Sequence, residues 1–274
     1  EFRRVLFRSC MPNRATLLTG RMPSAHGLRH NGNHLSYDAS TFVEVLRVAG
    51  YRTALIGKSH VQAMTPYPAP PAIDPAKLGP IKGAWKDDGG DYLNEVPERY
   101  EPAEKYEFKP PYYGYDHIDM VTNHGDQANG HYYQWLKAQT PNADLWRDPK
   151  SQLPHNYTCP QAIRTALPEE LYPTAFIRDR AVDYLRGASK ADPFFLMVSF
   201  PDPHHPFTAP GKYWDMYKPE DMPVPAAYTR KDWKPSPFVQ RLTEARESGK
   251  SKGEGQAAFA VSQKETLEAR ALTL

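Results

Sequence analysis

Residues 10–21 of the chain read C-M-P-N-R-A-T-L-L-T-G-R, a pattern typical of a short helix. Pro12 suits the first helical position, because its missing N–H would be unpaired there in any case, and Gly20 can end the helix. A helix N-terminus offers free backbone N–H groups and a partial positive charge, so it favours an anion. Arg14 adds a fork of donors that matches a tetrahedral oxyanion. The stretch therefore predicts that Cys10 lies where an anionic substrate is held.

Two interpretations of Cys10 follow from this stretch. A lone cysteine is usually a small buried hydrophobic residue, and the pattern Cys-x-Pro alone does not indicate catalysis. The longer pattern C-x-P-[S/A/N]-R followed by L-T-G-R resembles the signature of the sulfatase family, with Asn13 standing where serine is commonest. The resemblance implies that Cys10 is oxidised to formylglycine, whose hydrated aldehyde attacks the sulfur of a sulfate ester. It also implies that Arg14 stabilises this nucleophile and the ion site.

The composition sets broad limits on the kind of protein. The chain has 274 residues, enough for one large domain or two small ones, and its 40% of hydrophobic residues can build a core. A net charge of +2 does not favour nucleic acid or a membrane surface as a partner. No apolar run approaches the roughly 20 residues that span a membrane, and the two cysteines do not make a disulfide framework. Residues 1–9 are basic and begin without Met, so we expect a non-native leader, and the compartment (periplasmic, secreted or cytoplasmic) stays open.

Residues 41–57 predict a helix followed by a buried strand. Thr41 and Glu44 form a capping-box pattern at the start of the helix, and Gly50 ends it. The residues expected to face the core recur at helical spacing: Phe42, Val45, Leu46 and Ala49. Residues 51–57, Y-R-T-A-L-I-G, then form a short apolar run typical of a strand in an α/β protein.

Polar side chains follow this strand in G-K-S-H, residues 57–60. Ligands collect at the carboxyl ends of strands in open α/β sheets, and an extended chain would point Lys58 and His60 to the same side. Such a pair can bind an oxyanion and donate a proton, although a surface lysine beside a structural histidine is the commoner arrangement. The pattern G-Y-x-T-x-x-x-G-K-x-H resembles the second sulfatase signature. The resemblance implies that Lys58 contacts the sulfate and the formylglycine, and that His60 orients the diol and assists breakdown of the sulfated intermediate.

Residues 22–32 and 61–173 are rich in turn-forming residues and predict loops near the site. The first loop carries polar residues that either contact the substrate or form a solvated turn: His26, Arg29, His30 and Asn31, with His34 just beyond the loop. The second is a long insert that we expect to wall the substrate pocket, with a short strand at residues 114–119. Its aromatic residues are candidates for contact with the leaving group or for packing of the loops: Tyr92, Tyr112, Tyr113, Tyr132, Tyr133, Trp135 and Trp146.

Residues 174–200 repeat the order of helix and strand. The helix is predicted over residues 174–188 with Thr174 as its cap. Its residues expected to face the core are Phe176, Ile177, Ala181, Tyr184 and Leu185. Residues 194–200, F-F-L-M-V-S-F, are a continuous apolar run that favours a central parallel strand buried on both faces.

The next segment, P-D-P-H-H-P-F at residues 201–207, follows the carboxyl end of that strand. Together they match F-F-L-x-V-S-F-x-x-P-H-x-P-F, which resembles a third sulfatase element whose first histidine contacts the sulfate. The resemblance implies that His204 binds a sulfate oxygen or protonates the leaving alkoxide, whereas His205 falls on a variable position. Adjacent histidines on an extended chain point opposite ways, which argues against a zinc ion shared by the two.

Taken together, the three motifs imply an alkaline-phosphatase-like α/β fold, a three-layer sandwich around a mostly parallel mixed sheet. The resemblance extends over residues 10–274, which we interpret as part of a catalytic domain that is incomplete at both ends. It also implies calcium or another divalent cation, held by Cys10 as formylglycine and by Asp, Asn or His residues before Cys10 and well after His204. Residues 1–9 contain no Asp, and the later candidates lack a matching context: Asp202, Asp215, Asp221 and Asp232. We therefore expect the remaining metal ligands outside this chain.

The predicted function is that of a sulfuric ester hydrolase. Its predicted partners are a sulfated small molecule or carbohydrate and a formylglycine-generating enzyme. One alternative is a phosphonate or phosphate ester hydrolase of the same superfamily, and another is a non-catalytic anion-binding relative with unmodified Cys10. Because a bound cation supplies several kcal/mol of charge stabilisation, we expect slow turnover or none from this chain alone.

Overall fold

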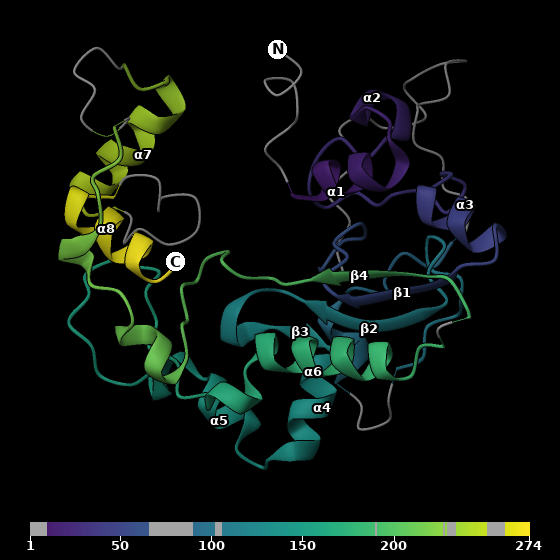
Figure 1. Cartoon of the computed structure of the whole chain (residues 1–274). Helices are drawn as coiled ribbons and strands as arrows, with labels where there is room; N and C mark the ends of the chain where they lie inside the picture. The colour runs from purple at the N-terminus through teal and green to yellow at the C-terminus, as the bar shows by residue number, and fades with distance from the viewer. Residues whose placement is uncertain are drawn as a thin grey trace. The chain divides into compact units, whose positions relative to one another are not determined.

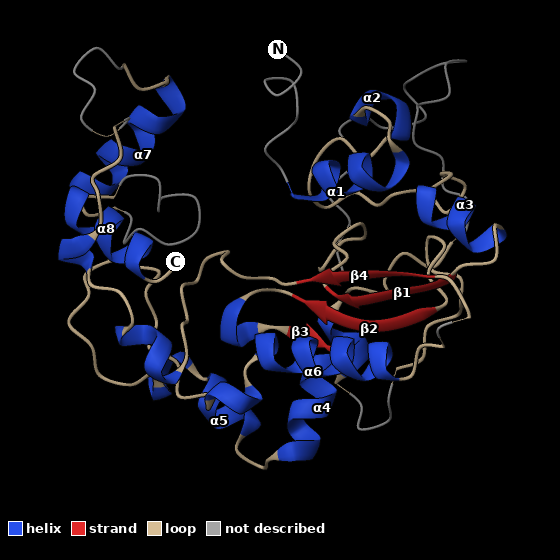
Figure 2. Cartoon of the chain, in the orientation of Figure 1, coloured by secondary structure: helices blue, strands red, loops and turns tan. Residues whose placement is uncertain are grey.

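The computed structural model describes residues 10–65, 90–101, 106–189, 191–226, 228, 234–250 and 261–274 (Figure 1). These residues fall into two compact units. The first unit comprises Glu1–Asn123, Ala128–Gln139 and Pro173–Pro201, and the second comprises His124–Gln127, Thr140–Tyr172 and Asp202–Leu274. The sheet belongs to the first unit (Figure 2).

The sheet has four strands in the order β3-β2-β1-β4. The parallel strands are β1 (Arg52–Gly57), β2 (His117–Thr122) and β4 (Phe194–Ser199). The short β3 (Asn129–Gly130) pairs antiparallel with β2. The predicted α/β class with a mostly parallel mixed sheet is therefore confirmed.

Helices of the first unit cover both faces of its sheet, which gives three layers (Figure 1). One side carries α1 (Cys10–Thr19), α2 (Pro23–His26) and α3 (Phe42–Val48), and the other carries α4 (His131–Gln139) and α6 (Pro173–Arg186). This layered arrangement agrees with the predicted sandwich. Short 3-10 turns occupy Pro97–Tyr100, Gly125–Gln127, Pro149–Ser151, Glu169–Leu171, Gly211–Asp215 and Pro219–Asp221 in the two units.

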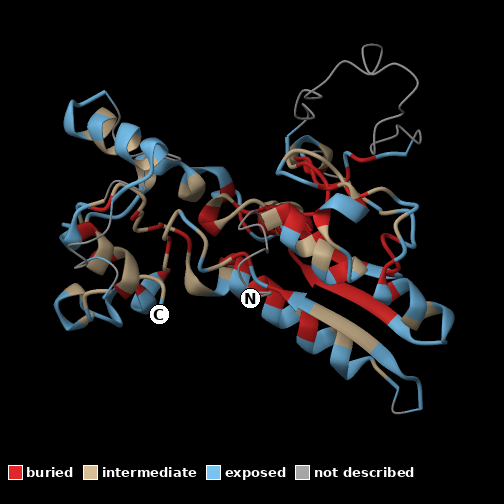
Figure 3. Cartoon of the chain, turned by 90° about the horizontal axis from the view of Figure 1, so that it is seen from above, coloured by how far each residue is buried: buried red, intermediate tan, exposed pale blue. Residues whose placement is uncertain are grey.

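The central strand of the first unit is β1, which is buried from Thr53 onward (Figure 3). Leu55 is paired in register with Ile118 of β2 and Met197 of β4, so all three side chains lie on one face of the sheet. That face packs against Met11 of α1 and other residues of one apolar cluster. Burying one such side chain contributes about 1.5–3 kcal/mol. The apolar composition of residues 51–57 thus predicted the strand correctly.

The position of β4 in the sheet differs from its prediction. The apolar run predicted a strand buried on both faces, but β4 is an edge strand of the described sheet and pairs only with β1 there. Phe194 and Val198 keep 40% and 38% of their surface exposed. Apolar composition therefore identified the strand but did not determine how many neighbours cover it.

The helix α3 begins as predicted but buries another residue. Thr41 accepts a hydrogen bond from the N–H of Glu44 at 3.1 Å, as a cap should. Val43 is buried, whereas the predicted core residues Phe42 and Val45 are exposed. The reason is a contact that periodicity does not encode. A Cβ on Gly114 would lie 2.4 Å from the Glu44 nitrogen, so the insert packs directly against the start of α3.

The helix α6 begins one residue before its predicted start. Thr174 lies inside its first turn and not at its cap. Of the predicted core residues, Phe176, Ile177 and Ala181 are buried, Tyr184 is half-buried and Leu185 is exposed. The apolar stripe therefore predicted the first part of the buried face correctly and failed in the last turn.

The second unit contains α5 (Ala143–Arg147), α7 (Pro237–Glu247) and α8 (Gln263–Ala271). Its apolar cluster gathers around Trp214 and Cys159, so Cys159 is a packing residue. Glu268 of α8 accepts a hydrogen bond from the backbone N–H of Cys159 at 2.7 Å, which fixes the backbone at this residue. None of the helices in the described ranges is long and apolar enough to cross a membrane.

Candidate active site

Arg14 connects α1 to the ends of two strands in the first unit. Its Nη1 donates to the carbonyl oxygen of Lys58 at 2.8 Å and to that of Ser59 at 3.3 Å. The same nitrogen donates to Ser199 Oγ at 3.1 Å. Lys58 follows β1 and Ser199 ends β4, and the two strands are parallel. Arg14 therefore lies at the carboxyl edge of the sheet, where α/β proteins bind ligands.

Lys58 lies at the same edge and is only 2% exposed. Its ammonium Nζ donates to the carbonyl oxygen of Asn123 at 3.2 Å, and Asn123 directly follows β2. The ends of β1, β2 and β4 thus meet around two cationic side chains, those of Arg14 and Lys58. Such a pair of cations is suited to holding an anion with several oxygens.

His60 is buried, but its backbone is not extended. Its φ angle is +57°, which places it in the left-handed region. The argument that Lys58 and His60 point to one side assumed an extended chain, and that condition is not met. A carboxylate instead organises this turn: Glu95 accepts from the N–H groups of His60, Val61 and Gln62 at 2.7, 2.9 and 3.0 Å.

Cys10 is the first residue of α1, and its side chain is a free thiol that is partly exposed. The next N–H, that of Met11, donates to Asn31 Oδ1 at 3.1 Å. Gly20 ends the helix with a φ of +65° and donates its N–H to the Thr16 carbonyl oxygen, as its sequence predicted. The loop that follows therefore returns to the start of α1 through Asn31, beside Cys10.

The predicted loop at residues 22–32 contains the short helix α2, and its two histidines have different surroundings. His26 is buried, accepts from the Leu28 N–H at Nδ1 and contacts Thr16 Oγ1 through Nε2 at 3.1 Å. His26 is thus a structural residue of the turn. Arg29 and His30 are exposed.

Burial and nearby charges shift the pKa of Arg14 in opposite directions. Burial lowers the pKa of Arg14 below its ordinary value, while the nearby Glu95 and Cys10 raise it. A guanidinium keeps its proton under these conditions, so Arg14 remains a cation. Burial raises the pKa of the Glu95 carboxyl, and its hydrogen bonds from Tyr112 and the backbone at residues 60–62 act in the opposite direction.

The aromatic residues of the insert divide between packing and surface. Tyr92, Tyr112, Tyr113 and Tyr132 are buried, so they pack the loops and are not available to a leaving group. Tyr133, Trp135 and Trp146 are partly exposed. Tyr37, which the sequence did not single out, stacks between Tyr92 and Tyr113 with ring centroids 4.9 and 4.8 Å away.

His204 belongs to the second unit, so it is described with its neighbours there. Its ring stacks on His124 with the centroids 3.6 Å apart, and the ring of His205 lies 4.2 Å away. The two adjacent histidines therefore do not point in opposite directions, because residues 202–206 form a turn and bends. His204 Nδ1 lies 2.6 Å from the His205 carbonyl oxygen. A carbonyl oxygen only accepts, so Nδ1 carries a proton and Nε2 is the nitrogen that gains or loses one.

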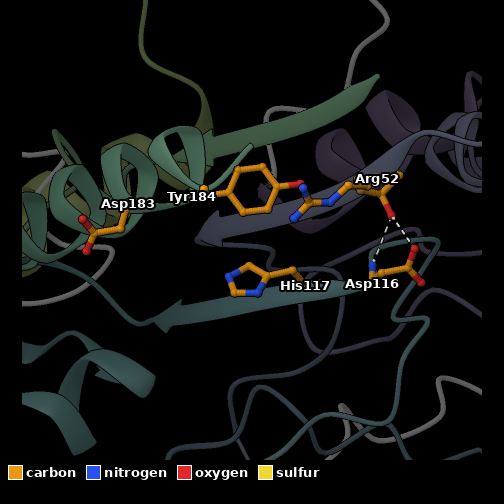
Figure 4. Close-up of a pocket in the computed structure, with 7 residues that line it drawn as sticks. Arg52, Asp116, His117, Asp183 and Tyr184 are labelled. Atoms are coloured by element: carbon orange, nitrogen blue, oxygen red, sulfur yellow. Dashed lines mark hydrogen bonds between the residues drawn. The ribbon is translucent and has the colours of Figure 1, made fainter. Parts of the chain in front are cut away.

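A pocket of about 370 Å³ lies elsewhere in the first unit (Figure 4). Its lining includes Arg52 and His117, the first residues of β1 and β2, and Tyr184 near the end of α6. Arg52 packs over the Tyr184 ring, 5.6 Å from its centroid. These residues are at the amino ends of the strands, so the pocket is separate from the edge that carries Lys58.

Comparison with known proteins places the chain in a family. The model of the family described as Sulfatase matches residues 103–258, more than half of the chain. The chain belongs to the sulfatase family. The match includes His204, whereas Cys10 and Lys58 lie before it.

This sulfatase-family chain is similar to longer proteins. The arylsulfatase of Clostridium perfringens is 28% identical over 79% of this chain and 38% of its own length. The multifunctional alkaline phosphatase superfamily protein PehA of Trinickia caryophylli is 30% identical over 79% of this chain and 36% of its own length. The chain therefore spans less than half the length of these curated relatives.

The fold agrees with this family. The crystal structure of the phosphonate monoester hydrolase of Agrobacterium radiobacter matches with a TM-score of 0.58 and 21% identity. The match covers 96% of this chain and 46% of that structure. The predicted alkaline-phosphatase-like fold is thus confirmed.

The sulfatase family generally uses a divalent cation, and the described residues do not fit one by themselves. Within the described ranges, no three His, Cys, Asp or Glu side chains come together as metal ligands. Asp91, the first described acidic residue after the turn at His60, instead pairs with Arg99 at 2.7 Å. We therefore derive no catalytic step through a metal ion.

The sequence did not identify three polar residues that the structure places beside the predicted ones. Ser199 accepts from Arg14, Glu95 holds the turn at His60, and His124 stacks on His204. Ser199 lies within the third motif, which predicts only its place in the strand. Nothing in the local sequence distinguishes Glu95 or His124 from other polar residues of the insert, because their partners are distant along the chain.

Proposed function

We propose that this chain carries the nucleophile and sulfate-binding residues of a sulfuric ester hydrolase. Membership of the sulfatase family supports hydrolysis of an oxyanion ester. The observation that carries the proposal is the set of contacts made by Arg14. One guanidinium nitrogen links the helix of Cys10 to Lys58 and Ser199 at the carboxyl ends of two strands.

In this proposal the residues have separate tasks. Conversion of Cys10 to formylglycine supplies, in its hydrated form, the hydroxyl that attacks the sulfur. Arg14 and Lys58 bring two positive charges to the edge of the sheet where the anionic sulfate is held, and they stabilise charge that develops on its oxygens. His60 orients the nucleophile from the buried turn after β1.

His204 is proposed to give a proton to the leaving oxygen or to bind a sulfate oxygen. Its Nδ1 already donates to the His205 carbonyl oxygen, so the transferable proton is on Nε2. Imidazole suits this task because its ordinary pKa is close to neutral pH.

A phosphonate or phosphate ester hydrolase of the same superfamily is the second candidate. The fold likeness to a phosphonate monoester hydrolase favours keeping it. The same two cations would hold a phosphonate, because both anions are tetrahedral. The ratio of the rates on 4-nitrophenyl sulfate and 4-nitrophenyl phenylphosphonate distinguishes the two candidates.

The test uses the chain produced together with a formylglycine-generating enzyme. Mass spectrometry of the peptide containing Cys10 should show the aldehyde, and titration with inorganic sulfate should show binding. Lys58→Gln should weaken sulfate binding by roughly tenfold or more, since a hydrogen bond to a charged group contributes about 1.5–3 kcal/mol. Lys109→Gln is the matched control, because Lys109 is exposed on the same unit.

Three results would count against the proposal. A thiol that stays unmodified would favour the non-catalytic anion-binding relative. Equal sulfate affinity of Lys58→Gln and wild type would remove Lys58 from the binding site. Faster hydrolysis of the phosphonate than of the sulfate would favour the second candidate.

A further inference from the structure

Glu95 is a buried carboxylate with an unusual set of partners. It is fully buried and accepts four hydrogen bonds, three from consecutive backbone N–H groups and one from the Tyr112 hydroxyl at 2.8 Å. Within the described part of the chain, no lysine or arginine forms an ion pair with it. A buried charge is costly unless such donors compensate for its lost hydration. The backbone of residues 60–62 therefore supplies most of this compensation.

The turn that offers these N–H groups is strained at one residue. His60 adopts a φ of +57°, a value that residues other than glycine rarely adopt. Successive N–H groups in such a turn form a concavity that binds an anion. Here the anion is the side chain of Glu95, which belongs to the same unit but comes from the insert. The carboxylate thus holds His60 in a conformation that its own sequence does not favour.

The opposite side of this segment is held by a cation. Arg14 Nη1 donates to the carbonyl oxygens of Lys58 and Ser59. These carbonyl groups come just before the backbone N–H groups, beginning at His60, that donate hydrogen bonds to Glu95. The two charged residues are close enough for Glu95 to raise the pKa of Arg14. Residues 58–62 are therefore fixed between a guanidinium on the carbonyl side and a carboxylate on the N–H side.

We propose that Glu95 is a positioning residue for His60 and Lys58, an inference that rests on the proposed function of these two residues. Glu95 acts through the backbone of the turn and does not touch the substrate. Its carboxylate fixes the left-handed conformation of His60, and this conformation sets the direction of the imidazole relative to the Lys58 end of the segment.

The substitution Glu95→Gln tests this role with little change of shape. Oε1 accepts from Val61, Gln62 and Tyr112, whereas among the described residues Oε2 accepts only from His60. The amide oxygen should therefore take the Oε1 position, and the amide nitrogen should face the His60 N–H. The amide nitrogen introduced at position 95 and the backbone N–H of His60 would then face each other as two donors, and the bond at His60 would be lost. The bonds from Val61, Gln62 and Tyr112 would remain.

The first readout is the backbone amide of His60, followed by NMR in the purified chain. In Glu95→Gln, its proton resonance should move upfield and its hydrogen exchange should accelerate by roughly tenfold or more, as expected for loss of a bond to a charged acceptor. The control Glu98→Gln changes an exposed carboxylate three residues away and should leave this resonance in place. An unchanged His60 amide in Glu95→Gln would overturn the proposal.

The second readout is the dissociation constant for inorganic sulfate, with wild type as the reference. Glu95→Gln should raise it by roughly tenfold. Tyr112→Phe, which removes a donor to the same carboxylate but none from the turn, should leave both the His60 amide and the sulfate affinity unchanged. If Tyr112→Phe and Glu95→Gln weakened sulfate binding equally, Glu95 would be a packing residue and not a positioning residue.

The two proposals can fail separately. A wild-type chain that binds no sulfate would contradict the proposed function, and the His60 amide would still decide whether Glu95 fixes the turn. If Glu95→Gln does not fold, hydrogen exchange of the wild type decides instead. The amides of His60, Val61 and Gln62 should then be strongly protected, and exchange of the His60 amide at the rate of an unstructured peptide would overturn the proposal.

Discussion

Arg14 and Ser199, which are 185 positions apart in the sequence, meet at 3.1 Å between Nη1 and Oγ. This bond joins the helix that begins with Cys10 to the last residue of β4. It is made by the same nitrogen that donates to the Lys58 carbonyl oxygen. The position of α1 is therefore coupled to the ends of two strands through one side chain.

Arg14→Lys keeps the positive charge of this side chain but removes the planar guanidinium and its several N–H donors. A single ammonium cannot replace all the bonds to Lys58, Ser59 and Ser199 in the same geometry. We expect a loss of about 1–3 kcal/mol in the free energy of unfolding and a roughly tenfold weaker affinity for inorganic sulfate. Chemical denaturation and calorimetric titration measure the two effects. Arg21→Lys, at an exposed residue just after the same helix, is the control, and equal behaviour of the two variants would contradict the coupling.

Gly57→Ala should disrupt the junction of β1 and β4. Gly57 has a φ of +111°, and a Cβ there would lie 2.0 Å from the Ser199 carbonyl oxygen. Gly50 also has a positive φ, +90°, but has open space around it. Gly50→Ala should therefore cost only the backbone strain, about 1–2 kcal/mol, and Gly57→Ala about 1–3 kcal/mol more. Denaturation midpoints compare them, and a Gly57→Ala chain as stable as Gly50→Ala would show that the strands separate easily at this point.

His26 should make the first unit less stable in acid. Burial lowers the pKa of His26 below its ordinary value of 6.5, so the unfolded chain binds the proton more readily than the folded one. The contribution of neutral His26 is thus present above about pH 6.5 and is lost as the pH falls through the lowered folded pKa. Protonation would also remove the acceptor of the Leu28 N–H.

The measurement is the free energy of unfolding at several pH values between about 5 and 8. His26→Gln retains an acceptor and a donor but does not titrate, so its stability should fall less than that of wild type on acidification. His30→Gln, at an exposed residue of the same loop, should follow the wild-type curve. A wild-type curve parallel to that of His26→Gln would refute this role of His26.

Thr41→Ala should destabilise the contact between α3 and the insert. The hydroxyl of Thr41 accepts from the Glu44 N–H and donates to the Tyr113 carbonyl oxygen at 2.9 Å. Losing the cap and leaving a buried carbonyl without its donor should together cost about 1–3 kcal/mol. Thr41→Ser retains the hydroxyl and should lose much less. Thermal unfolding compares the variants, and equal losses would assign the effect to the methyl group instead of the hydrogen bonds.

The parts of the fold that the sequence predicted well are those encoded locally. The apolar run at residues 51–57 and the glycine that ends α1 both depend on neighbours along the chain, and both were predicted correctly. The three motifs also predicted the family correctly, because the order of Cys10, Lys58 and His204 along the chain carries that information.

The parts of the fold and site that the sequence did not predict depend on contacts between residues far apart along the chain. Val43 replaces the predicted stripe on α3 because Gly114 approaches from the insert. Glu95 could not be recognised because its partners at residues 60–62 are more than thirty positions away. The relation of His204 to His205 was predicted wrongly because an extended chain was assumed where the structure has a turn. The catalytic roles of Cys10 and His204 stay predictions until the experiments above are done.

The strand β4 has a consequence for handling the protein. Its sequence, F-F-L-M-V-S, carries no charge, and in the described sheet one of its edges exposes backbone donors and acceptors beside Phe194 and Val198. An edge of this kind is a template on which another extended chain can add by backbone hydrogen bonding. Preparations of this chain should therefore self-associate more as concentration rises, and a charged residue in place of Val198 would make that assembly costly.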